Sequence, residues 1–126
     1  MEFLHQDKTE KIIQAYFKVY NTLGYGFLEK VYQNALLIEL RRMGFECKSQ
    51  SPIKVFYEGF LVGDYFADII VDDCVILENK AKEVLIEDDE FQLINYLKST
   101  KIEVGLLLNF GKRPGFKRKI FTNNRK

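Results

Sequence analysis

The sequence has no tryptophan, one histidine, two cysteines and two prolines among its 126 residues. Because Cys47 and Cys74 lie far apart and have no histidine near them, we do not expect a zinc site or a disulfide framework. This cysteine usage favours a reduced, cytoplasmic protein. No apolar run approaches the ~20 residues that cross a bilayer, so we expect no membrane partner.

The sequence also has almost no excess of one charge over the other, since its formal net charge is only +1. Bulk charge therefore does not indicate a nucleic-acid partner. Its distribution is more informative, because residues 112–126 hold seven Lys or Arg and no acid. Basic tails commonly contact nucleic acid, although many only increase solubility, and this tail alone leaves both readings open.

The length fits one domain spanning residues 1–126, with the basic tail 112–126 at its end. Hydrophobic periodicity predicts helices at 7–23, 27–43 and 87–100, and strands at 52–58, 60–71, 74–81 and 102–110. A strand, helix and strand in succession form a β-α-β unit with a parallel strand pair. The predicted fold is α/β (α+β): a mixed sheet, antiparallel at its start and flanked by helices, in the order α-α-β-β-β-α-β.

Three charged residues interrupt two otherwise apolar strands: Asp68, Glu78 and Lys80. Glu78 and Lys80 are two apart and share a face of their strand. Asp68 joins that face only if the hairpin loop has three residues, so that Val71 pairs with Val75 and Asp68 lies opposite Glu78; a two-residue turn would place it on the other face. Three-residue loops are common and aspartate tolerates their left-handed backbone, so we predict the three-residue loop.

Two opposed carboxylates repel each other unless a cation lies between them. Oxygen ligands with open positions suit Mg²⁺ or Mn²⁺. Lys80 could then orient or deprotonate an attacking water, or stabilise a developing negative charge. The alternative is that Lys80 neutralises the two acids in a structural ion-pair cluster.

Two helices carry further polar candidates. Gly26, Glu29 and Tyr32 form G-x-x-E-x-x-Y at the start of the second helix, and Glu29 and Tyr32 share a side of it. In the later helix Gln92 and Tyr96 are four apart and also share a side. Gln92 could contact the attacking water or a scissile phosphate, or could simply be a boundary residue.

The ordered set G-x-x-E-x-x-Y, D-x9-E-x-K, Q-x3-Y and a final apolar strand ending in "NFG" resembles the GxxExxY family, a small member of the PD-(D/E)XK nuclease superfamily. The resemblance covers residues 7–121 and implies a restriction-endonuclease-like core. Ala67 replaces the proline of the nominal PD motif. Asn79 stands where an apolar residue is usual, so its side chain requires a hydrogen-bond partner on the buried face.

The resemblance implies a Mg²⁺- or Mn²⁺-dependent hydrolase that cuts phosphodiester bonds of nucleic acid, DNA rather than RNA. Asp68 and Glu78 would bind the metal, with the backbone carbonyl of Asn79 and the Glu29 carboxylate as further candidates. Lys80 would be the catalytic lysine, with Gln92 and Glu29 as further catalytic candidates. The candidate nucleic-acid-binding residues are Tyr96, Lys112, Arg113, Lys117, Arg118 and Lys119.

A nuclease fold that binds nucleic acid or a protein partner without cutting is the alternative, because fold does not determine function. Presence of Asp68, Glu78 and Lys80 together favours the enzyme. A homodimer is considered as well, since a chain this small needs a second copy or a partner to grip a duplex.

Overall fold

The computed structural model of the protein describes residues 4–126. Its elements, in chain order, are α1 (Gln6–Leu23), α2 (Glu29–Arg42), β1 (Cys47–Tyr57), β2 (Phe60–Val71), β3 (Val75–Lys80), α3 (Glu87–Lys98), β4 (Val104–Phe110), β5 (Pro114–Ile120) and a short 3-10 helix η1 (Asn123–Arg125). The predicted order of helices and strands is confirmed as far as β4, and β5 is an additional strand. No helix within residues 4–126 is both long and apolar enough to cross a bilayer.

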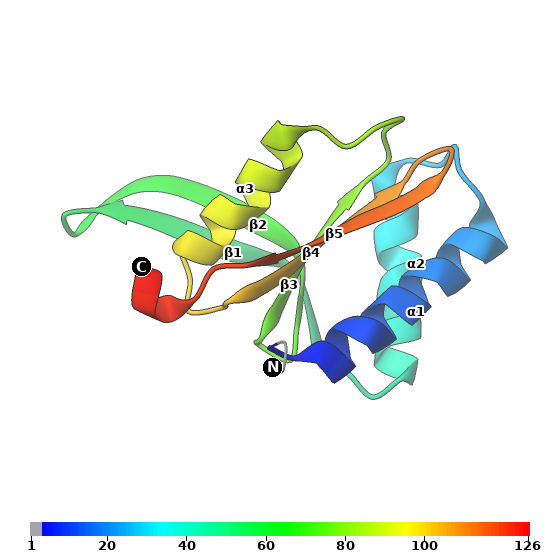
Figure 1. Ribbon diagram of the computed structural model, residues 1–126, viewed down its shortest axis with the longest axis horizontal. Helices are drawn as coiled ribbons and strands as arrows, with labels where there is room; N and C mark the ends of the chain where they lie inside the picture. The colour runs from blue at the N-terminus through cyan, green and yellow to red at the C-terminus, as the bar shows by residue number, and fades with distance from the viewer. Residues whose placement is uncertain (1–3) are drawn as a thin grey trace.

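The five strands form one mixed sheet in the order β1-β2-β3-β4-β5 (Figure 1). The β1–β2, β2–β3 and β4–β5 pairs are antiparallel, whereas β3 and β4 are parallel. Helix α3 is the crossover between the two parallel strands, as the β-α-β pattern predicted. Strands β3 and β4 occupy the centre of the sheet and are almost wholly buried.

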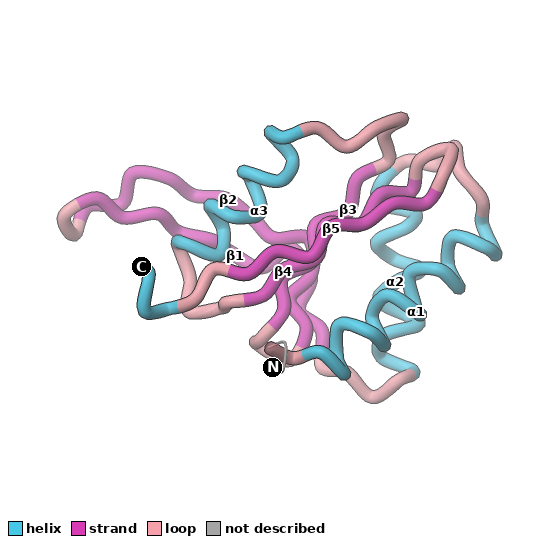
Figure 2. Tube along the Cα trace, in the orientation of Figure 1, coloured by secondary structure: helices cyan, strands magenta, loops and turns pink. Residues whose placement is uncertain are grey.

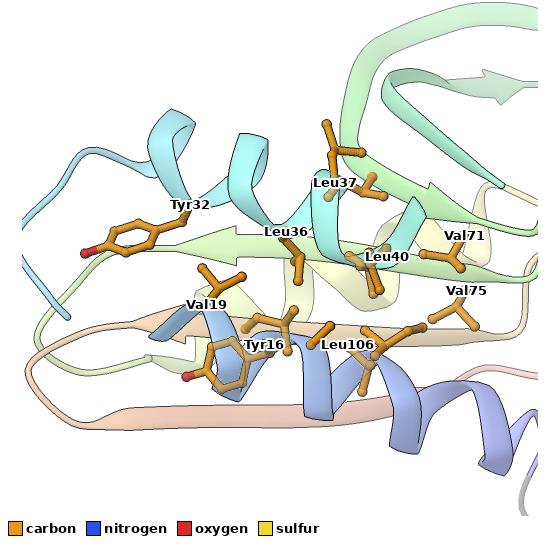
Figure 3. Packing of buried hydrophobic residues seen from close by; sticks show 14 of the residues in the cluster. Tyr16, Val19, Tyr32, Leu36, Leu37, Leu40, Val71, Val75 and Leu106 are labelled. Atoms are coloured by element: carbon orange, nitrogen blue, oxygen red, sulfur yellow. The ribbon is translucent and has the colours of Figure 1, made fainter. Parts of the chain in front are cut away.

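Helices cover both faces of the sheet. Helices α1 and α2 cover one face, and Figure 3 shows Tyr16 and Val19 of α1 converging with Leu36 and Leu40 of α2 over the strands. The opposite face packs against α3, through Leu93 and other apolar residues of that helix. In Figure 2 the β1–β2 hairpin extends beyond this layered body, on the side away from α1 and α2.

The β2–β3 hairpin has the predicted three-residue loop. Val71 pairs with Val75, and the loop residues Asp72 and Asp73 have φ angles of 51° and 54°. Aspartate tolerates this left-handed conformation better than most residues because its short side chain bonds locally. This register brings Asp68 next to Glu78, just beyond the last paired residues of the two strands, Ile69 and Leu77.

Part of the expected basic tail folds as β5, an edge strand antiparallel to β4. Tyrosines of α1 anchor it, since the Gly115 N–H donates to the Tyr16 hydroxyl at 2.9 Å and the Tyr20 hydroxyl donates to the Gly111 carbonyl at 2.7 Å. The sequence did not predict this strand, because charged side chains, which are typical of exposed edge strands, leave no alternation of apolar and polar residues in it.

Candidate active site

Two carboxylates meet where β2 and β3 separate. The ladder between these strands ends at Ile69 and Leu77, and beyond that pair β3 continues only beside β4. There the Asp68 N–H donates to Glu78 Oε2 at 2.9 Å, and the Asn79 N–H donates to Asp68 Oδ2 at 2.7 Å. One oxygen of each carboxylate thus accepts a hydrogen bond from the backbone of the opposite strand. The second oxygen of each accepts no hydrogen bond from an amide, hydroxyl or ammonium group within residues 4–126.

The electrostatic balance at this point is unfavourable for two negative charges. Burial, together with the neighbouring Asp68 charge, raises the pKa of Glu78 to about 8. The Asp68 N–H and the Lys80 ammonium oppose this shift without cancelling it. At neutral pH the pair is therefore short of positive charge, which a bound cation would supply.

Lys80 belongs to a short chain of polar side chains rather than to an ion pair. Its ammonium donates to Gln92 Oε1 at 3.0 Å, and Gln92 Nε2 lies 3.3 Å from the Tyr96 hydroxyl. The ion pairs within residues 4–126 involve none of Asp68, Glu78 and Lys80. The arrangement thus favours a Lys80 held in place by α3 over a salt-bridged cluster.

Helix α2 begins beside the hollow that Asp68 lines. The Tyr32 hydroxyl donates to the Gly24 carbonyl at 2.7 Å and accepts from the Phe27 N–H at 3.2 Å, so the buried tyrosine closes the turn before the helix. Gly26 in this turn has a φ of 112°, which glycine adopts without strain. The exposed Glu29 follows in the first turn of α2.

Glu29 and Asp68 line the same surface hollow, which has a volume of about 520 Å³. The wall of this hollow includes Gln33, whose Nε2 donates to the Asp68 carbonyl at 3.2 Å and whose Oε1 accepts from Gln50 Nε2 at 3.2 Å. Sequence reasoning missed Gln33, although its position four residues after Glu29 places both on one helix side. Within residues 4–126, no three His, Cys, Asp or Glu side chains gather closely enough to bind a metal by themselves.

A second residue that the sequence did not reveal is Asn109, buried near the end of β4. Its Oδ1 accepts from the Lys82 N–H at 3.1 Å and its Nδ2 donates to the Lys82 carbonyl at 2.9 Å. The Lys82 ammonium then pairs with Asp89 at 2.8 Å, and Asp89 accepts from the Ile86 N–H at 2.9 Å. The loop between β3 and α3 is therefore fastened at both ends. A polar residue inside the run "GLLLNF" was the available signal.

Asn79 lacks the hydrogen-bond partner that its position requires. Its side chain lies on the face opposite Glu78, beside Leu108 of β4, and only 1% of the residue is exposed. Neither its Nδ2 nor its Oδ1 has a partner within residues 4–126. An unpaired buried amide costs on the order of 1–3 kcal/mol, so the unusual residue in E-x-K weakens the strand that carries the site.

Basic side chains of β5 are divided between the two faces of the sheet. Lys117 and Lys119 point to the α3 face, where Lys119 forms an ion pair with Glu90. Arg118 points to the other face, where its guanidinium donates to the Leu4 carbonyl. Strand alternation thus separates residues that are adjacent in the sequence.

Lys112 and Arg113 are exposed in the turn between β4 and β5. Lys112 lines a hollow of about 500 Å³ together with Gly26 and Ala81. Of the basic candidates, Lys112 is thus the one that lies beside the turn before α2 and the end of β3.

The superfamily of the chain follows from a match that covers most of its length. The sequence model of the PD-(D/E)XK nuclease superfamily matches residues 6–119, and the chain belongs to this superfamily. The mixed sheet flanked by helices is consistent with its restriction-endonuclease-like fold. Nucleases of this superfamily generally use divalent metals and act on nucleic acid.

Other comparisons add little to this assignment. No curated protein matches the chain. One solved structure, entitled "Crystal structure of SSO0001", is similar over 95% of this chain and 81% of its own, with 15% identity and a TM-score of 0.49.

Proposed function

We propose that the protein is a divalent-metal-dependent nuclease of the GxxExxY type that hydrolyses phosphodiester bonds, in DNA rather than RNA. One observation supports this most directly: the carboxylates of Asp68 and Glu78 converge at the end of the β2–β3 ladder, and neither forms an ion pair with a basic side chain of residues 4–126. A buried carboxyl group that faces a second acid, as Glu78 faces Asp68, costs stability and is expected where it serves a ligand.

The oxygen atoms of the pair fit a Mg²⁺ or Mn²⁺ ion. Mg²⁺ is typically bound by one or two carboxylates, with waters and substrate phosphates completing its coordination, so a site with fewer than three acidic side chains is sufficient. Asp68 and Glu78 would bind the ion, with the Asn79 carbonyl and Glu29 as further candidate ligands. When bound, the ion supplies Lewis-acid activation of the phosphate and of a water.

The side chains of the site divide the remaining work. Lys80 would orient or deprotonate the attacking water and stabilise negative charge on the phosphate. Its hydrogen bond to Gln92 limits the positions that its ammonium adopts, and Tyr96 holds Gln92 in turn. Lys112, Arg113 and Lys117 would contact backbone phosphates without reading sequence.

Cutting assays test the proposal. Labelled single- and double-stranded DNA and RNA are incubated with the protein and Mg²⁺, Mn²⁺ or EDTA. We expect cutting that needs the metal and falls by about 10²- to 10⁴-fold in Lys80→Ala, the range for a lost general acid–base group. Lys101→Ala is the matched control, because Lys101 is exposed and lies in the loop before β4. Salt-sensitive binding without cutting under any metal would instead establish the alternative, a nuclease fold that only binds.

Calorimetry with Mn²⁺ tests the ligands separately from catalysis. We expect Asp68→Asn and Glu78→Gln to weaken Mn²⁺ binding, whereas Lys80→Ala largely spares it because the ammonium donates to Gln92 instead. Equal Mn²⁺ affinity in the three variants would remove Asp68 and Glu78 as ligands.

A further inference from the structure

A surface hollow continues the candidate active site along α3. It has a volume of about 950 Å³ and is lined by residues of that helix and of the β1–β2 hairpin. Gln92 and Tyr96, which hold Lys80, also form part of its wall. A ligand in this hollow would therefore reach the catalytic groups without leaving the surface.

Aromatic rings line this hollow and remain open to solvent. Phe56 and Tyr65 come from the hairpin and Phe91 from α3, and each is at least half exposed. The ring centroids of Tyr65 and Tyr96 lie 5.9 Å apart, so the row of aromatic rings continues from the hairpin to Tyr96 at the candidate active site. Monomeric proteins rarely expose contiguous apolar surface of this kind without a binding function.

The charges around the rings suit a polyanion. Lys54 and Lys98 border the hollow, against one acid, Asp88. Lys54 takes part in no ion pair within residues 4–126. Aromatic rings beside lysines are the combination by which proteins hold single-stranded nucleic acid, with bases on the rings and phosphates near the cations.

Addition of a second copy along β1 is less compatible with these residues. Strand β1 is an edge of the sheet, and it carries Pro52, Lys48 and Lys54. Proline and lysine on an edge strand are typical barriers to strand addition. The rings of the hollow, by contrast, are reached from outside without any change in the sheet.

We propose that the hollow between the β1–β2 hairpin and α3 binds unstacked bases of a nucleic-acid strand, with Phe91 and Tyr65 as stacking platforms. This inference rests on the proposed nuclease function and refines its substrate: a single strand, or the frayed end of a duplex. No side chain of the hollow is needed to read a base edge, so the stacking tolerates any sequence.

Fluorescence anisotropy in EDTA measures this binding without cutting. The probes are labelled dT12, a 12-nucleotide strand without bases, and a blunt 12-base-pair duplex. We expect dT12 to bind most tightly of the three probes. Phe91→Ala and Tyr65→Ala should each weaken the affinity for dT12 by about tenfold and leave the affinity for the abasic strand unchanged. Phe91→Trp should retain binding. Phe60→Ala is the control, since Phe60 is exposed on the same hairpin but does not line the hollow.

Three results would overturn the inference: equal affinity for dT12 and the abasic strand, an unchanged dT12 affinity in both alanine variants, or no binding of single strands at all. Sedimentation in which Phe91→Ala turns a dimer into a monomer, with dT12 affinity unchanged, would make the hollow an interface between copies instead. Failure of the nuclease proposal is distinguishable, because base-dependent binding without any metal-dependent cutting leaves the stacking site standing. Cutting of single strands at the same rate by wild type and Phe91→Ala would remove the stacking site alone.

Discussion

Removal of the Asn109 side chain provides a sharp test of how the site is held. Asn109 makes two hydrogen bonds to the backbone of Lys82, two residues after the proposed catalytic lysine. In Asn109→Ala both bonds are lost, and the Lys82 N–H and carbonyl lose these partners. Gly111 passes so close to the Lys82 carbonyl that a Cβ there would lie 2.3 Å from it, which leaves little room for water to replace the amide.

The size of the effect follows from these contacts. A hydrogen bond contributes about 0.5–1.5 kcal/mol net, and a buried group left without a partner costs on the order of 1–3 kcal/mol. We therefore expect Asn109→Ala to lower the free energy of unfolding by about 2–4 kcal/mol. Because the loop leads from Lys80 into α3, the cutting rate should fall as well, since small displacements of catalytic groups can cost up to about 10²-fold.

Urea unfolding followed by circular dichroism measures the stability, and hydrogen exchange at residues 81–86 reports a local release of the loop. Asn109→Asp separates hydrogen bonding from volume, because it preserves the size and one acceptor but removes the donor to the Lys82 carbonyl. Asn34→Ala, at an exposed position of α2, is the control. The reasoning is refuted if Asn109→Asp retains wild-type stability and exchange protection, or if Asn109→Ala behaves like the control.

Two further predictions concern the same region. Gly111→Ala should lower the melting temperature, because its Cβ meets the Lys82 backbone oxygen, whereas Gly115→Ala, which meets no atom within 4 Å, should not; equal shifts would contradict this. Metal-free wild type should lose about 4 kcal/mol of stability as pH rises from 4 to 7.5. The sign follows from the raised Glu78 pKa of about 8: protonation stabilises the fold below the ordinary value of 4.5, and that contribution is lost toward pH 8. Glu78→Gln, compared with wild type by urea unfolding in EDTA, should lack this part of the pH dependence, and an identical pH profile would refute the cause assigned to it.

Local patterns determined much of the fold. The period of the apolar residues is a property of each segment, so the helices and the first four strands could be placed without knowledge of their neighbours. The β2–β3 register was also predictable, because turn length and side-chain alternation together leave few choices. The confirmed three-residue loop brings Asp68 next to Glu78, although the two residues lie just beyond the paired part of the strands and not directly opposite each other within it.

Contacts between distant segments determined the rest. Gln33 and Asn109 act on Asp68 and Lys82 across separations of 35 and 27 residues, and no local period reports such hydrogen bonds. The basic tail became an edge strand because tyrosines of α1 hold it, and the pairing with β4 then sent Arg118 and Lys119 to opposite faces. The motif residues could therefore be identified from the sequence alone. The polar residues that support them and the aromatic hollow beside them form only when the folded backbone brings remote segments together.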